Sequence, residues 1–148
     1  MAETENLPSL MKSAAALMKR DVKEAVVVYE RAFHRAVALG VDDDVAFVAE
    51  TLARAWMRAK SPSRGLRYAR VATKRAPEER SGHTTLGNVC ELLASNTDTT
   101  RKARRARRLY DSAAEAFAKA AALTKDREDR QWLVELSNDA ARASKAIA

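Results

Sequence analysis

The chain has 148 residues, of which 47% are hydrophobic but only 5% are aromatic, and its formal net charge is +7. This length suits one domain with a hydrophobic core of useful size. Four glycines and three prolines leave little turn chemistry for a β protein, and a single cysteine excludes an internal disulfide framework. The composition therefore predicts an all-α fold.

Apolar residues recur at helical spacing along the chain, and short breaks divide them into segments. The first predicted helix covers about residues 7–20. The second follows Asp21, an N-cap residue with Glu24 three positions later as in a capping box, and it ends at Gly40 as a C-cap. The acidic run 42–44 favours the start of a third helix, because the helix dipole stabilises negative charge there.

The second half of the sequence predicts four more helices. Ser61 and Pro62 form an N-cap with proline in the first turn, and Pro77 stops that helix. A fifth helix ends near Ser95, and a sixth runs from about residue 99 to 125. The apolar face of the seventh helix is predicted to be Trp132, Leu136, Ala140, Ala143 and Ile147.

An internal repeat links the middle of the chain to its second half. The pair Leu52-Ala53 recurs as Leu86-Gly87, 34 residues later, and residues 52–77 resemble a tetratricopeptide repeat. The matching positions are Leu52, Ala53 and Trp56, then Gly65, Leu66, Tyr68, Ala69, Ala72 and Pro77. The resemblance implies one domain, 1–148, built as a right-handed stack of antiparallel helical hairpins. Its three repeats would cover about 7–40, 43–77 and 78–125, with a capping helix at about 127–146.

A second resemblance involves two segments that look like each other, 27–60 and 108–147. Both resemble the last two helices of an MIT (microtubule-interacting and transport) domain, with Tyr29, Arg31 and Tyr110 at matching positions. Two such units imply a regulator of the vacuolar-sorting AAA ATPase of the ESCRT pathway. Its partners would be C-terminal helices of membrane-remodelling subunits.

The tetratricopeptide resemblance implies a groove lined by first-helix residues that face away from the packing side. The protein would be a non-enzymatic adaptor or scaffold that binds a peptide or helix of a partner protein there. The methionines are equally consistent with core packing. By position the lining residues are Met11, Met18 and Lys19, then Glu50, Arg54, Met57 and Arg58, and finally Thr84, Asn88 and Glu91.

The sequence offers no convincing constellation for catalysis or metal binding. His34 and His83 each have one glutamate four residues earlier, which is too few ligands for zinc. Cys90 lies on an apolar helix face and is predicted to be a small buried side chain. The scattered glycines form no phosphate-binding loop. We therefore expect no enzyme activity, no metal, no cofactor and no small-molecule substrate.

A basic run covers residues 101–108. At 100° per residue, Ala103, Ala106, Tyr110, Ala113 and Phe117 share one helix face. The run has two interpretations: the solvated face of an amphipathic helix, or a patch that binds an acidic protein, an anionic membrane surface or RNA. Arg101, Arg104, Arg105 and Arg108 fall opposite the apolar face, with Lys102 and Arg107 on its flanks.

The first ten residues, MAETENLPSL, have neither the basic region nor the apolar region of a signal peptide. No stretch approaches 18 uninterrupted apolar residues, so no membrane span is predicted. Together with the single cysteine, these features predict a cytoplasmic protein.

Overall fold

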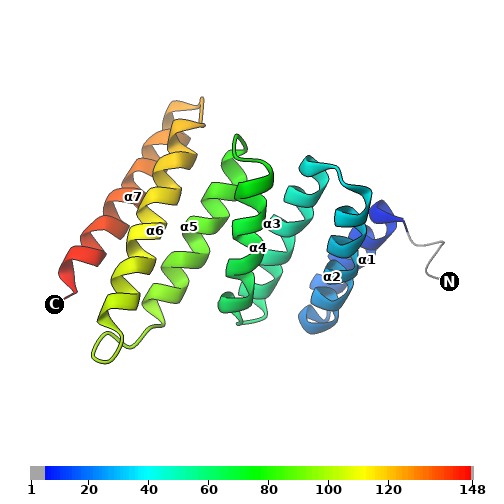
Figure 1. Ribbon diagram of the computed structural model, residues 1–148, viewed down its shortest axis with the longest axis horizontal. Coiled ribbons are helices and arrows are strands. Elements are labelled where there is room, and N and C mark those ends of the chain that lie inside the picture. Colours follow the sequence, from blue (N-terminus) through cyan, green and yellow to red (C-terminus); the bar gives the residue numbers. More distant parts are fainter. Residues whose placement is uncertain (1–5, 148) are drawn as a thin grey trace. The chain divides into compact units, whose positions relative to one another are not determined.

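A computed structural model describes residues 6–147, and within this range all regular structure is helical (Figure 1). The all-α prediction is thus confirmed. The first five residues, part of the segment used to argue against a signal peptide, lie outside the described range. The helices are α1 (Leu7–Met18), α2 (Val22–Leu39), α3 (Asp42–Arg58), α4 (Pro62–Arg75), α5 (Arg80–Ser95), α6 (Ala103–Ala122) and α7 (Arg127–Ala146).

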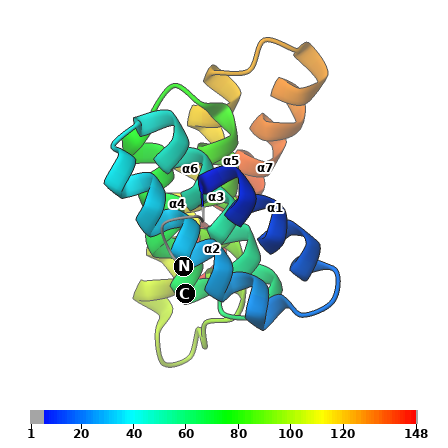
Figure 2. The same cartoon turned by 90° about the vertical axis from the view of Figure 1, so that its right-hand side faces the viewer.

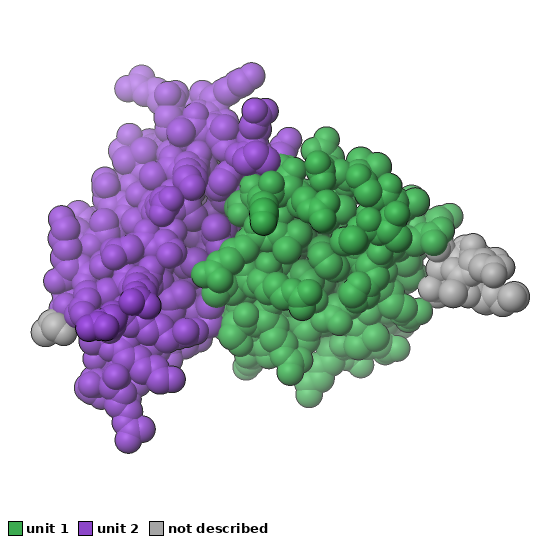
Figure 3. Space-filling view, in the orientation of Figure 1, with its two compact units in different colours: residues 1–76 green, residues 77–148 purple. Residues whose placement is uncertain are grey.

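The chain divides into two compact units between Ala76 and Pro77 (Figure 3). Helices α1 to α4 belong to the first unit and α5 to α7 to the second. The sequence predicts a single domain, and the division lies one residue before the boundary predicted between its second and third repeats. Pro77 has no amide hydrogen to continue a helix, and α4 ends with Ala76 as its C-cap residue.

Within each unit, helices that are consecutive in the chain pack against each other. In the first unit α1 packs on α2, α2 on α3 and α3 on α4, and the first of these pairs is seen from the side in Figure 2. In the second unit α6 packs on both α5 and α7. The largest fully buried side chains are Leu52, Val45 and Val48 in the first unit and Phe117, Leu133, Val89 and Cys90 in the second.

Two glycines permit close approaches between helices. A methyl group on Gly65 of α4 would lie 2.9 Å from the carbonyl oxygen of Ala53 in α3. A methyl group on Gly87 of α5 would lie 2.6 Å from a ring carbon of Phe117 in α6. Both distances are shorter than any ordinary contact between non-bonded carbon or oxygen atoms. Small residues therefore let these helix pairs pack closely, as the repeat pattern predicts.

Several predicted helix ends are confirmed. The Glu24 amide donates a hydrogen bond to Asp21 Oδ1 at 3.1 Å at the start of α2. Gly40 has φ +75° and ends the same helix. The acidic run 42–44 occupies the first turn of α3. Ser61 does sit at the N-cap position of α4, but its side chain makes no capping hydrogen bond there.

Gly40 provides a test of this backbone geometry. A side chain at Gly40 would meet no atom within 4 Å, so Gly40→Ala changes only the cost of a left-handed conformation, about 1 kcal/mol. We expect the free energy of unfolding in urea to fall by that amount. Gly40→Asn is the matched control, because asparagine tolerates this conformation better. An equal loss for both variants would show that the cost does not arise from the backbone.

Helix α6 is shorter than predicted, spanning Ala103–Ala122 and not 99–125. Thr100 donates hydrogen bonds to Asp98 Oδ1 from its amide at 3.0 Å and from its hydroxyl at 2.7 Å. This local turn competes with helix formation. As a result Arg101 precedes α6, and Lys102 is its N-cap residue.

The buried face of α7 also differs from the predicted one. Leu133 is 1% exposed, whereas Trp132 is 52% exposed. Two serines share the buried side of the helix with Leu133. Ser137 Oγ donates to Ala114 O at 2.8 Å and Ser144 Oγ donates to Arg107 O at 3.4 Å. Because α6 carbonyls accept these hydrogen bonds, the serines can face the packing surface.

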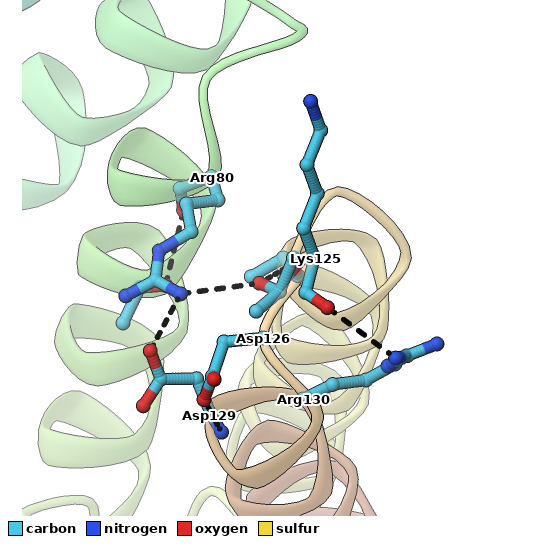
Figure 4. A network of polar contacts seen from close by, with 8 residues as sticks. Arg80, Lys125, Asp126, Asp129 and Arg130 are labelled. Atoms are coloured by element: carbon cyan, nitrogen blue, oxygen red, sulfur yellow. Dashed lines mark hydrogen bonds and ion pairs between the residues drawn. The ribbon is translucent and has the colours of Figure 1, made fainter.

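A polar network joins the start of α5 to the turn between α6 and α7 (Figure 4). Arg80 forms an ion pair with Asp129 at 3.3 Å and approaches the Thr124 hydroxyl at 3.5 Å. Asp126 caps α7 by accepting from the Asp129 amide at 2.9 Å. These contacts link the start of α5 to the end of α6 and the start of α7.

None of the helices within residues 6–147 is both long enough and apolar enough to cross a lipid bilayer.

Candidate functional site

The second unit contains a hollow between α5 and α7, with α6 beneath it. We call it the α5–α7 groove, and its volume is about 430 Å³. Helices α5 and α7 both pack on α6, which leaves their neighbouring faces to form the two walls. The lining residues are Asn88, Glu91, Leu92 and Ser95 of α5, Tyr110 of α6, and Leu136, Asp139, Ala140 and Ala143 of α7.

The groove combines apolar walls with polar groups. Leu92 and Leu136 supply the larger aliphatic side chains, and the half-buried Tyr110 contributes an aromatic ring. On α7, Asp139 is ion-paired with Arg142, one turn later, while on α5 the amide of Asn88 can both donate and accept hydrogen bonds. Such a surface can bury apolar side chains and orient a polar segment.

Two of the three groove residues predicted on α5 do line this groove. Asn88 is exposed and Glu91 is half-buried, and both lie on the α5 wall. Thr84 is not among the lining residues. It lies one turn before Asn88, and its hydroxyl donates to the Arg80 carbonyl oxygen at 3.0 Å.

Sequence reasoning missed the α6 and α7 contributions to the groove. Helical spacing of apolar residues places Tyr110 and Leu136 on packing faces. Both are in fact only half-buried and line the groove. Asp139 was not singled out. One signal could have indicated this groove. A capping helix that packs on α6 beside α5 leaves a groove between α5 and itself.

The groove residues predicted in the first unit have mixed surroundings. Glu50 is only 7% exposed, so it does not line an open surface as predicted. Its carboxylate instead pairs with Arg54 at 3.4 Å, one helical turn away. Among the others, Lys19, Arg54 and Arg58 are exposed, while Met11, Met18 and Met57 are half-buried.

The first unit has a hollow of its own, of about 410 Å³, between α2 and the α3–α4 turn. The Arg64 guanidinium lies 5.0 Å from the centre of the Trp56 ring, a cation–π arrangement. The Trp56 Nε1 atom is buried without an acceptor among the described residues. Sequence reasoning placed Trp56 in a packing face and missed this hollow. Its lining residues are Lys23, Val26, Val27, Glu30, Trp56, Ala59, Ser61 and Arg64.

One aromatic pair lies near this hollow. Tyr68 of α4 packs edge-on against Phe33 of α2, with ring centres 5.1 Å apart. Burial raises the pKa of the Tyr68 hydroxyl above its usual value, and the adjacent Glu30 carboxylate raises it further. The phenol therefore stays neutral at physiological pH and can donate a hydrogen bond to Glu30.

The predicted basic patch separates into exposed and structural members. Arg101, Lys102, Arg104, Arg105 and Arg108 are exposed. Arg107 is half-buried, and its Nη1 donates to the Ile147 carbonyl oxygen at 3.4 Å. Arg107 therefore joins α6 to the end of α7, a role that the sequence pattern did not reveal.

Other residues considered for chemistry have structural surroundings. Cys90 is 1% exposed, so its predicted burial is confirmed. His83 is buried with Nε2 2.7 Å from the Pro77 carbonyl oxygen, and His34 is exposed. Within residues 6–147, no group of three or more His, Cys, Asp or Glu side chains is placed to hold a metal ion.

Comparisons with known proteins give no assignment. The sequence matches no family model and no curated protein. The tetratricopeptide and MIT resemblances therefore stay predictions.

Proposed function

We propose that this protein is a non-enzymatic adaptor that binds a peptide or helix of a partner protein in the α5–α7 groove. The observation that carries the proposal is the groove itself, where three helices bring apolar side chains and polar groups together. We also propose a reducing, cytoplasmic setting, because a single cysteine allows no disulfide within the chain.

The spacing of the lining residues suits an elongated occupant. On α7, Leu136, Ala140 and Ala143 follow the i, i+4, i+7 pattern of one helix face. On the opposite wall, Asn88, Leu92 and Ser95 repeat the same pattern on α5. Ala143 is small and only half-buried, which leaves room for a larger side chain from the partner. An amphipathic helix placed along the groove would match both walls.

The polar groups give the groove a preference for hydrogen-bond donors. Glu91 lies on the α5 wall and Asp139 on the α7 wall. Asp139 already accepts a hydrogen bond from Arg142. The Glu91 carboxylate is therefore expected to attract a lysine or arginine of the partner more strongly than Asp139 does. We therefore expect bound segments to place apolar residues at helical spacing, with a basic residue at one edge.

Selection from a random peptide library displayed on phage, with the full chain as bait, tests this function. Leu136→Asp puts a charge in the apolar wall and is expected to weaken selected peptides at least about tenfold, because a desolvated charge costs more than 1.4 kcal/mol. Val134→Asp is the matched control, since Val134 is 38% exposed on the same helix and does not line the groove. Fluorescence anisotropy of labelled peptides measures both affinities.

Two outcomes would contradict the proposal. One is a library that yields no enriched peptide. The other is a set of peptides whose affinity falls equally for the two aspartate variants. Circular dichroism of both variants checks that the helices remain folded, so that a loss of binding reflects the groove.

A further inference from the structure

Exposed basic residues gather at the start of α6. We call the set Arg101, Lys102, Arg104, Arg105 and Arg108 the α6 ridge, and all five side chains are exposed. Arg101 and Lys102 precede the helix, and the other three lie in its first two turns. Within the helix, Arg108 is spaced three and four residues from Arg105 and Arg104, so these three side chains are neighbours on the surface of α6.

The ridge is placed where positive charge is unfavourable for the helix itself. The first turn of α6 contains no acidic residue, and Lys102 provides no side-chain cap. Cations near a helix N-terminus oppose the dipole, so Arg104 and Arg105 weaken α6. Cations kept at a helix N-terminus against this electrostatic preference indicate that these arginines have a role other than stabilising the fold.

Nearby acids neutralise the ridge only in part. Asp98 accepts hydrogen bonds from the Thr100 hydroxyl and amide, which together lower its pKa, and it also attracts Lys102. Asp111 is exposed one turn after Arg108. These two carboxylates face five cations, so a net positive surface remains at this end of the second unit.

The ridge is separate from the α5–α7 groove. At 100° per residue, Arg104, Arg105 and Arg108 lie about 120° to 160° around α6 from Tyr110, the groove residue of this helix. The apolar side of α6 is already used for packing, since Ala106, Leu109 and Phe117 are buried. The two surfaces can therefore be occupied independently.

We propose that the α6 ridge binds the phosphate backbone of a nucleic-acid duplex without reading its sequence. Four of the five cations are arginines, whose planar guanidinium groups pair with phosphate oxygens through two hydrogen bonds. The buried apolar face leaves α6 with no exposed hydrophobic side to insert into a membrane interface. The ridge also contains no aromatic residue on which single-stranded bases would stack.

The expected strength follows from the number of phosphates neutralised. Contact with about four phosphates gives a logarithmic salt slope of about −3.6. Affinity for a duplex should then fall about 100-fold as salt rises from about 50 to about 200 mM. A duplex of DNA and a duplex of RNA, each of about 20 base pairs, are the probes in anisotropy titrations of the full chain.

The test variant neutralises the helical part of the ridge. Glutamine keeps a helix propensity close to that of arginine, so the substitution changes charge with little change in folding. We expect at least a tenfold loss of duplex affinity at low salt and a salt slope reduced by about 2 to 3. The variant is Arg104→Gln with Arg105→Gln and Arg108→Gln.

A matched control removes the same charge from the first unit. Its three positions are exposed cations on α2 and α4, and their loss should leave duplex affinity within about threefold of the unmodified chain, because only long-range screened attraction is reduced. An equal loss in both variants would overturn the proposal, since binding would then follow net charge. The control is Arg35→Gln with Arg70→Gln and Lys74→Gln.

Two further readouts complete the test. The ridge variant should unfold at the same or a higher temperature than the unmodified chain, because it removes cations from the helix N-terminus; lower stability would contradict this account of the ridge. Vesicles containing phosphatidylserine are the competing probe. No duplex binding at low salt, or ridge-dependent binding to vesicles that is as strong as binding to duplex, would overturn the proposal.

Discussion

Replacing Phe117 by alanine is expected to lower the free energy of unfolding of the second unit by about 3 to 5 kcal/mol. The Phe117 side chain is 0% exposed and is the largest of the fully buried side chains. Its ring packs directly against Gly87, so α5 and α6 would lose this contact. Urea unfolding followed by circular dichroism measures the change.

Gly87 turns this experiment into a test of the contact itself. In the unmodified chain, Gly87→Ala places a methyl group 2.6 Å from the ring, and overpacking of this kind costs about 1 to 3 kcal/mol. In the Phe117→Ala background the space is open, so the same change should stabilise the unit by up to about 1 kcal/mol through helix propensity. Destabilisation of similar size in both backgrounds would show that the two residues are not in contact.

Replacing Leu133 by alanine is expected to cost about 2 to 5 kcal/mol, because this side chain is buried between α7 and α6. Leu133 is 1% exposed, while the neighbouring Trp132 is 52% exposed. Trp132→Ala should therefore change the free energy of unfolding by less than about 1 kcal/mol. Thermal and urea unfolding of the two variants show which substitution lowers the free energy of unfolding more. A larger loss for Trp132→Ala would mean that α7 buries the face predicted from the sequence.

The helices themselves were predictable because their ends carry local chemical signals. Asp21 accepts the capping hydrogen bond, Gly40 adopts a left-handed conformation, and the residue before Pro77 closes α4. The start of α6 was not predictable in this way. Asp98 and Thr100 form a turn before the helix. The residues after them have helical spacing of apolar side chains, but no capping residue marks where the turn ends and α6 begins.

The buried face of α7 shows why burial was harder to predict than helix formation. Periodicity assigns large apolar residues to the core, which favoured Trp132. The structure buries Ser144 instead, and its hydroxyl finds an acceptor on Arg107 of α6. Only the partner helix reveals that acceptor. A serine without it would carry the cost of an unpaired buried hydroxyl.

The candidate groove was predictable on one wall only. Asn88 and Glu91 are polar residues that lie off the packing face of α5, and the sequence pattern identified them. Tyr110 and Leu136 are apolar, so their half-exposed positions depend on the space between α5 and α7. Glu50 was predicted from the same pattern and proved buried, because its charge is paired with Arg54 within α3.

The packing of each helix mainly on its chain neighbours has a consequence for how quickly the protein reaches its native state. Contacts between neighbouring helices join residues that are close in sequence, which keeps the entropy lost in loop closure small. Proteins dominated by such local contacts fold within microseconds to milliseconds. The first unit can therefore form as soon as its own helices have left the ribosome, while the second unit is still being made.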